Sequence, residues 1–279
     1  MSVLTRCEDQ LILQNRSRRT RDSYLRCTRQ FIEWLDDTPI DDVDEERVRH
    51  YLVHLVVDRH FRPPNLKLHV AAMKYLFKDV LRRPQVVAAI PWPKVPVAVV
   101  HVLTKAEVRR LFAHAPNLRV KAMMMIAYAG GLRVGELVAL QPLDIESERM
   151  ILHIRRGKGA KLRMVMLSKS LLITLRQYWR AYRPVGPWLF PSPRDSQRHL
   201  SARETQRRFR QAAHAAGIRK PCSMHSLRHA FATHLMESGV DITTLQALLG
   251  HRRLGTTVRY VHLRTEFITQ TRSPLDPPE

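Results

Sequence analysis

The chain has 279 residues, of which 47 are Lys or Arg and 25 are Asp or Glu, so that its formal net charge is +22. This length allows one large domain or two ordinary ones, and the charge favours a polyanionic partner such as nucleic acid or an anionic membrane. The short apolar run 97–103 cannot span a bilayer and the charged start lacks a signal peptide's apolar stretch, so we expect a cytoplasmic protein without membrane contact.

Apolar residues in the first ninety positions recur at three- and four-residue steps, which predicts amphipathic helices. The pattern covers residues 24–35, 48–56 and 66–80, the last after the break at Pro63-Pro64. Basic residues lie between the apolar positions. They fit either a solvated helix face or a surface that faces phosphates.

A proline-rich segment follows the helical region. Pro91, Pro93 and Pro96 fall within six residues, and proline at this density favours extended backbone over helix. We therefore predict a helical domain over residues 1–90, a linker over 91–101 and a second domain over 102–279.

The second domain opens with helices. Thr104 and Glu107 have the spacing of a capping box, in which hydroxyl and carboxylate satisfy free amides at a helix start. A helix over 123–129 is predicted to stop at Gly130-Gly131. Further helices are predicted from Ser168, from a second capping box at 201–204, over 225–237, and from about 241 to 250, with the stretch 184–198 as a loop.

Two runs of strand-forming residues, 150–155 and 162–167, flank the basic tip 157–160 and predict a β-hairpin. The predicted fold class is therefore mainly α with a small antiparallel β-sheet. Its parts are a helical first domain and an α+β second domain.

Five places in the second domain combine cationic, imidazole and phenol groups. They hold Arg133, Lys158, the pair His225 and Arg228, His251, and Tyr260. Taken singly, each has an ordinary explanation: an arginine paired with Glu136, a solvated lysine, or a packed tyrosine. No H-E-x-x-H pattern occurs, and Cys7, Cys27 and Cys222 form no C-x-x-C pair. We therefore predict no metal site and reduced thiols.

In this order and at these spacings, the five places resemble the tyrosine recombinase (phage integrase) family. The likeness is carried by G-L-R-V-G-E-L at 131–137, by R-G-K-G-A-K-L-R-M-V-M-L at 156–167, and by H-S-L-R-H-A-F-A-T-H-L at 225–235 with L-L-G-H-x₈-Y at 248–260. The first domain, from residue 20 to 34, resembles the family's helical core-binding domain. Both Xer-like and integron-integrase-like patterns agree with parts of the chain, and the subgroup stays open.

The resemblance implies a site-specific recombinase that cuts and rejoins double-stranded DNA through a 3′-phosphotyrosine. The implied site is Arg133, Lys158, His225, Arg228, His251 and the nucleophile Tyr260. Glu136 would hold Arg133 or form an ordinary surface pair. Guanidiniums can neutralise the charge of the transition state and the phosphotyrosine conserves the energy of the broken diester, so neither metal nor other cofactor is expected. The implied assembly on DNA, within the bacterial nucleoid, is a homotetramer.

Two other functions stay open at this point. A type IB-like topoisomerase would use the same tyrosine chemistry on one duplex, and a catalytically silent DNA-binding protein would keep only the fold. No small-molecule substrate is predicted. The tail 265–279 reads either as a frayed terminus or, by family resemblance, as a segment that docks on a neighbouring subunit.

Overall fold

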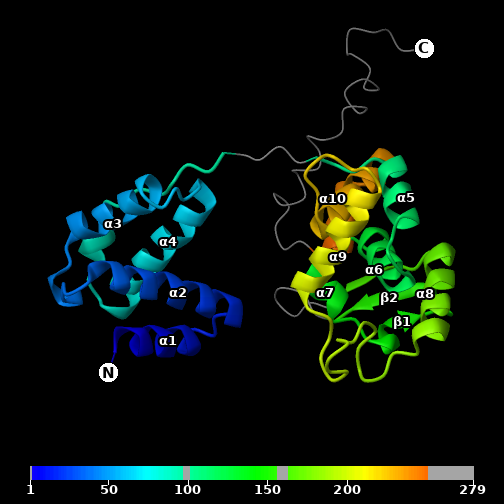
Figure 1. Ribbon diagram of the computed structural model, residues 1–279, viewed down its shortest axis with the longest axis horizontal. Coiled ribbons are helices and arrows are strands. Elements are labelled where there is room, and N and C mark those ends of the chain that lie inside the picture. The colour runs from blue at the N-terminus through cyan, green and yellow to red at the C-terminus, as the bar shows by residue number, and fades with distance from the viewer. Residues whose placement is uncertain (1, 97–100, 156–162, 251–279) are drawn as a thin grey trace, which may run out of the picture. The chain divides into compact units, whose positions relative to one another are not determined.

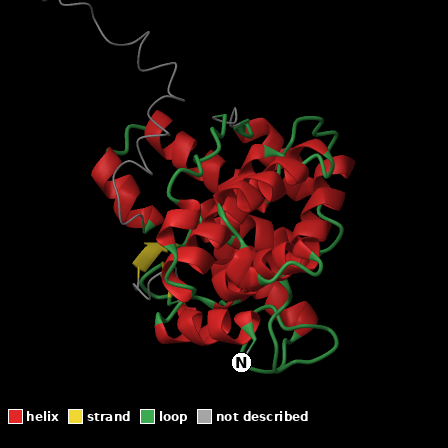
Figure 2. Ribbon diagram, turned by 90° about the vertical axis from the view of Figure 1, so that its left-hand side faces the viewer, coloured by secondary structure: helices red, strands yellow, loops and turns green. Residues whose placement is uncertain are grey.

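The computed structural model describes residues 2–96, 101–155 and 163–250 (Figure 1). The chain divides into two compact units, Met1–Val99 and Val100–Glu279. Most of the described elements are helices, coloured red in Figure 2, and the second unit also contains a small sheet. This confirms the predicted fold class. None of the described helices is long and apolar enough to cross a membrane.

The first unit is helical throughout its described elements. These are α1 (Val3–Leu13), α2 (Arg18–Leu35), α3 (Glu45–Val57), α4 (Pro63–Tyr75), the π-helical turn η2 (Leu76–Val80), and the 3₁₀ turns η1 (Ile40–Asp42) and η3 (Pro84–Val87). Side chains cap three of the helix starts, because Ser2, Ser17 and Asp44 each accept a bond from a backbone amide three residues on. Pro63 starts α4, where its missing N–H costs nothing.

The core of the first unit is built on aromatic rings from different helices. The ring centroids of Phe31 and Tyr51 lie 4.9 Å apart, and those of Phe31 and Phe77 lie 6.0 Å apart. The buried Tyr51 hydroxyl is hydrogen-bonded to Nδ1 of the buried His69 at 3.0 Å. Burial lowers the pKa of His69 to about 4, so this ring is neutral near pH 7.

The second unit surrounds an apolar helix. Its described elements are α5 (Lys105–Ala113), α6 (Leu118–Ala129), α7 (Val134–Val138), η4 (Pro142–Asp144), β1 (Ile145–Glu146), β2 (Ile151–Ile154), β3 (Arg163–Met166), α8 (Lys169–Tyr182), α9 (Ala202–Ala215), α10 (Met224–Glu237) and α11 (Ile242–Leu249). Residues Met123, Met124 and Ile126 of α6 are buried, and α6 packs against α8 and α10. Its last three turns are mostly apolar, and this part of the helix lies in the core of the unit.

The sheet is antiparallel in the order β1-β2-β3, with Ile151 opposite Met166 and Ile154 opposite Arg163. The strands are shorter than the predicted runs. Met150 has a positive φ of 55° and belongs to the turn that precedes β2, so the strand begins one residue later than predicted. The two-residue strand β1 was not predicted. The hairpin tip, with Lys158, lies outside the described residues.

Candidate active site

A glycine turn places Arg133 at the start of α7. Gly131 has a φ of +58°, and a Cβ on it would lie 2.5 Å from Cδ1 of Phe231, so only glycine fits there. The chain then passes to Arg133, whose backbone N–H donates to Oε2 of Glu136 at 2.8 Å. The carboxylate thus satisfies a free amide at the start of the helix. The turn and this bond together fix the backbone of Arg133.

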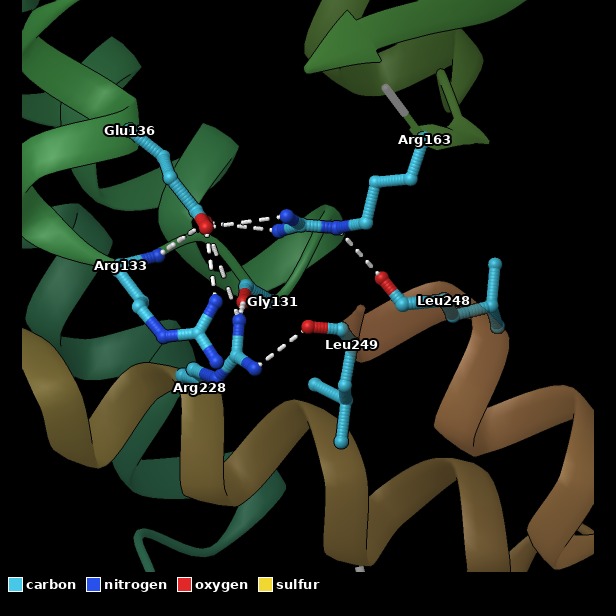
Figure 3. A network of polar contacts seen from close by, with 7 residues as sticks. All are labelled: Gly131, Arg133, Glu136, Arg163, Arg228, Leu248 and Leu249. Carbon is cyan, nitrogen blue, oxygen red and sulfur yellow. Dashed lines mark hydrogen bonds and ion pairs between the residues drawn. The ribbon is translucent and has the colours of Figure 1, made fainter. Parts of the chain in front are cut away.

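The carboxylate of Glu136 is the centre of a network of three arginines (Figure 3). Arg133 Nη1 donates to Oε1 at 2.8 Å. Arg163 donates through Nη1 to Oε1 at 3.0 Å and through Nη2 to Oε2 at 2.7 Å. Arg228 Nη1 lies 3.9 Å from Oε2. Three guanidiniums therefore share one negative charge.

Glu136 is a buried residue, with 3% of its side chain exposed, so the alternative of an ordinary surface pair is wrong. Burial by itself would raise the pKa of Glu136. Hydrogen bonds and charge from Arg163, followed by those from Arg133, outweigh this effect and lower the pKa of Glu136 below its usual value. The carboxylate is therefore ionised across the neutral pH range.

Arg228 reaches the network from α10 and is buried, with 1% of its side chain exposed. Its Nη1 donates to the carbonyl of Gly131 at 2.5 Å and its Nη2 to that of Leu249 at 2.7 Å. Arg163 Nε donates to the carbonyl of Leu248 at 2.8 Å. Two guanidiniums thus bind consecutive free carbonyls at the C-terminal end of α11, where the helix dipole favours positive charge.

His225 lies in the first turn of α10, one turn before Arg228, and is exposed. Ser223 starts the helix, because its Oγ accepts from the backbone N–H of His225 at 3.2 Å. Partial desolvation of the ring, followed by the charges of Arg228 and Arg133, lowers the pKa of His225. The neutral imidazole, which can accept a proton, is therefore favoured at this position.

The structure brings Arg133, Glu136 and Arg228 into one network, with His225 in the electrostatic field of both arginines. Lys158, His251 and Tyr260 lie outside the described residues. Among residues 2–96, 101–155 and 163–250, no group of three or more His, Cys, Asp or Glu is placed to hold a metal ion.

Arg163 is a member of the network that the sequence analysis did not single out. A signal was present in the hairpin. Residues two apart in a strand share a face, so Arg163 lies on the same face as the apolar Val165, which is buried. An arginine on the inner face of a strand needs a carboxylate partner.

The chain matches known protein families over most of its length. Residues 101–266 match the model of the phage integrase family, and residues 3–86 match its N-terminal SAM-like domain. A Sinorhizobium fredii protein named as an integrase/recombinase is 38% identical over 273 residues, covering 97% of this chain and 87% of the relative. Tyrosine recombinase XerA of Thermococcus kodakarensis is 32% identical and covers 95% of this chain and 92% of its own length.

Solved structures show the same fold. A crystal structure of XerA recombinase, 27% identical, aligns over 97% of this chain and 99% of that chain with a TM-score of 0.58. A lambda integrase dimer bound to a COC′ core site, 21% identical, aligns over 99% of this chain and 79% of that chain with a TM-score of 0.77. The arginine network, the two family matches and the full-length relatives agree, and the chain belongs to the phage integrase family as a tyrosine-type site-specific recombinase.

Proposed function

We propose that this chain breaks and rejoins double-stranded DNA by transferring a backbone phosphate to Tyr260, with Arg133 and Arg228 as the phosphate-binding residues. One observation carries the proposal: three guanidiniums meet a single carboxylate at Glu136, which leaves an excess of positive charge. A cluster of this kind is suited to bind the two non-bridging oxygens of a phosphodiester, which share one negative charge.

The reaction needs positive charge most when the phosphorus is five-coordinate. Attack by Tyr260 adds negative charge to the two non-bridging oxygens, and guanidiniums stay protonated at every working pH. Arg133, with 36% of its side chain exposed, is the accessible donor, and Arg228 would donate from beneath it. His251, which follows the helix-ending Gly250, would add a further donor.

Proton transfers complete the reaction. A free tyrosine phenol has a pKa of about 10, so Tyr260 needs a base or neighbouring cations to attack at neutral pH. Neutral His225 would take the phenol proton as the oxygen–phosphorus bond forms. Lys158 would give a proton to the 5′-oxygen as the old phosphorus–oxygen bond breaks. Rejoining reverses both transfers, and the phenol leaves.

The two domains would have different roles in the reaction. Residues 1–90 would form the core-binding domain, residues 91–101 the linker, and residues 102–279 the catalytic domain, so that both domains contact the duplex. Lambda integrase has been solved as a tetramer bound to a Holliday junction. That assembly supports a homotetramer on DNA as the working form here, because exchange between two duplexes needs four cleavages.

Replacing Tyr260 by Phe tests the proposal. The full chain and Tyr260→Phe would each be incubated with a supercoiled plasmid carrying the DNA that flanks the coding sequence. We expect the unchanged chain to form a protein–DNA adduct that survives boiling in detergent, and the variant to bind DNA equally but form none. An adduct from the variant would show that Tyr260 is not the nucleophile. Supercoil relaxation without recombinant products would favour the topoisomerase alternative, and binding without any nicking would favour the silent one.

A further inference from the structure

Each of the three side-chain nitrogens of Arg163 donates to another group of the protein (Figure 3). Two of these bonds go to the carboxylate of Glu136 and the third to the carbonyl of Leu248. Only 8% of the Arg163 side chain is exposed. Its planar guanidinium is thus oriented by the protein on two sides, and it faces inward.

The path of Arg163 along the end of α11 depends on a glycine. Gly250 ends the helix with a φ of +62°, and a Cβ on it would lie 3.1 Å from Arg163 Cδ and 3.4 Å from Nη1. The absence of a side chain leaves room for the guanidinium to reach Leu248. In sequence, Gly250 directly precedes His251, and Arg163 follows Lys158 by five residues.

Arg163 also limits how strongly the carboxylate of Glu136 attracts Arg133. Both carboxylate oxygens accept from Arg163, and the same two oxygens accept from the backbone and side chain of Arg133. Without Arg163, the buried carboxylate would keep Arg133 as its direct hydrogen-bond donor, with Arg228 at 3.9 Å. It would then attract those two guanidiniums more strongly, or take up a proton.

We infer that Arg163 is a positioning residue for recombination: it saturates Glu136 and fixes the end of α11, so that Arg133 and Arg228 are held in place for the scissile phosphate. The inference rests on the proposed function of those two arginines. A planar, forked donor is required, because an ammonium cannot bind two carboxylate oxygens and a carbonyl at once.

The test compares Arg163→Lys and Arg163→Met with the unchanged full chain. Arg155→Met is a matched control: Arg155 ends the strand run on the other side of the hairpin tip and pairs with buried Asp144, a different carboxylate. Two quantities would be measured. The first is the pKa of the Glu136 carboxyl by ¹³C NMR of glutamate-labelled protein without DNA. The second is the pH profile of adduct formation on the flanking-DNA plasmid at saturating protein.

We expect both Arg163 variants to slow adduct formation by about tenfold to a hundredfold at neutral pH, as small misplacements of reacting groups do, with DNA affinity unchanged. In Arg163→Met the Glu136 carboxyl loses its strongest donors, so its pKa rises. The acid limb of the pH profile should move upward with it. Arg163→Lys, which keeps the charge and protects folding, should still be slow. Arg155→Met should keep the profile of the unchanged chain.

Three results would overturn the inference. Full activity in Arg163→Lys would show that the fork is dispensable. A Glu136 pKa that stays the same in Arg163→Met would remove the coupling. A rate of adduct formation that falls equally at all pH values, together with a lower unfolding temperature, would show that Arg163 has only a structural role. If the unchanged chain itself forms no adduct while the Glu136 pKa shifts as expected, the proposed function fails and the inference with it, although the Arg163–Glu136 contact stands.

Discussion

Arg133 and Arg228 were predicted for the same task, yet the structure gives them different surroundings. Arg228 is the largest of the fully buried side chains in the described residues and bonds two carbonyls, whereas Arg133 is partly exposed. Removing a buried charge that others depend on usually costs several kcal/mol of stability. The side chain of Arg133, by contrast, bonds Glu136 and not the end of α11.

We therefore predict that Arg133→Ala and Arg228→Ala each lower cleavage by more than about a hundredfold, as loss of a transition-state donor does. They should differ in stability. Arg228→Ala should also lower the free energy of unfolding by about 3 kcal/mol, because Glu136 and two carbonyls lose a partner. Urea unfolding and single-turnover cleavage check this. Near-normal cleavage in either variant would contradict the phosphate-binding role, and rescue by lysine should be poor.

A second residue-scale prediction concerns acid stability of the first unit. The pKa of buried His69 is about 4 in the folded chain, below the ordinary value of about 6.5. The unfolded chain binds the proton more readily, so stability is fully present above pH 6.5 and is lost as the pH falls toward 4. The loss is up to about 3 kcal/mol.

Hydrogen exchange of α3 and α4 peptides between pH 4.5 and 7.5 measures this effect. His69→Gln should remove most of the acid sensitivity. The exposed His50 supplies a matched control, since His50→Gln should leave it unchanged. An acid sensitivity that persists in His69→Gln would assign it to other groups.

The sequence could predict part of the site at the residue scale. The R-x-x-E spacing placed Arg133 beside Glu136, and H-x-x-R placed His225 one helical turn from Arg228. Burial was not predictable, because it depends on packing between elements distant in sequence. Arg163 could have been placed on the inner face of its strand, but its partners could not be predicted, because they lie 27 and 85 residues away.

At the scale of elements, several helix starts followed local chemistry and were predictable, whereas α6 begins at Leu118 and not at the predicted residue 123. The capping box of Thr104 and Glu107 starts α5, and Ser201 caps α9 as its sequence signal suggests. The strand boundaries were less predictable. β1 has only two residues and gives no periodic pattern, and its pairing with β2 is a tertiary contact. The π-helical turn after α4 likewise has no local signal in the sequence.

The turn between α6 and α7 allows a prediction with an internal control. Gly131 and Gly217 both have positive φ, +58° and +65°, but only a Cβ on Gly131 would clash, with Phe231 and Leu249. Gly217→Ala should cost about 1 kcal/mol, which is the strain of the left-handed backbone alone. Gly131→Ala should cost that strain and in addition about 1–3 kcal/mol for overpacking. It should also slow cleavage, because Arg228 bonds the Gly131 carbonyl.

Thermal unfolding and adduct formation check this pair. Equal losses of stability in the two variants would show that the contacts with Phe231 and Leu249 yield easily.

At the scale of the whole molecule, the chain forms two compact units, each with its own hydrophobic core. We predict that a fragment lacking residues 1–96 folds, because a unit with its own core needs few contacts from outside. It should bind the flanking DNA more weakly than the full chain. The slope of log K against log salt should also be smaller in magnitude, since fewer phosphates are neutralised.

Filter binding at several salt concentrations measures both quantities. An unchanged affinity and slope in the fragment would show that the first unit makes no phosphate contacts. The sequence predicts a linker over residues 91–101 from three prolines, because the effect of proline on the backbone is local. It could not predict how the units are placed on DNA, which depends on contacts with the partner.

Because three arginines surround one carboxylate, the stability of the second unit is coupled to the binding of an anionic substrate. The guanidiniums repel one another, and Glu136 offsets only part of that repulsion. An oxyanion bound beside them therefore lowers the free energy of the folded unit more than that of the unfolded chain. Added salt then acts in two opposite directions: chloride screens attraction to DNA, whereas sulfate or vanadate raises the unfolding temperature of the catalytic unit. On the proposed function, the unit would be most resistant to unfolding while a DNA phosphate is bound, which is the stage at which a DNA strand is broken.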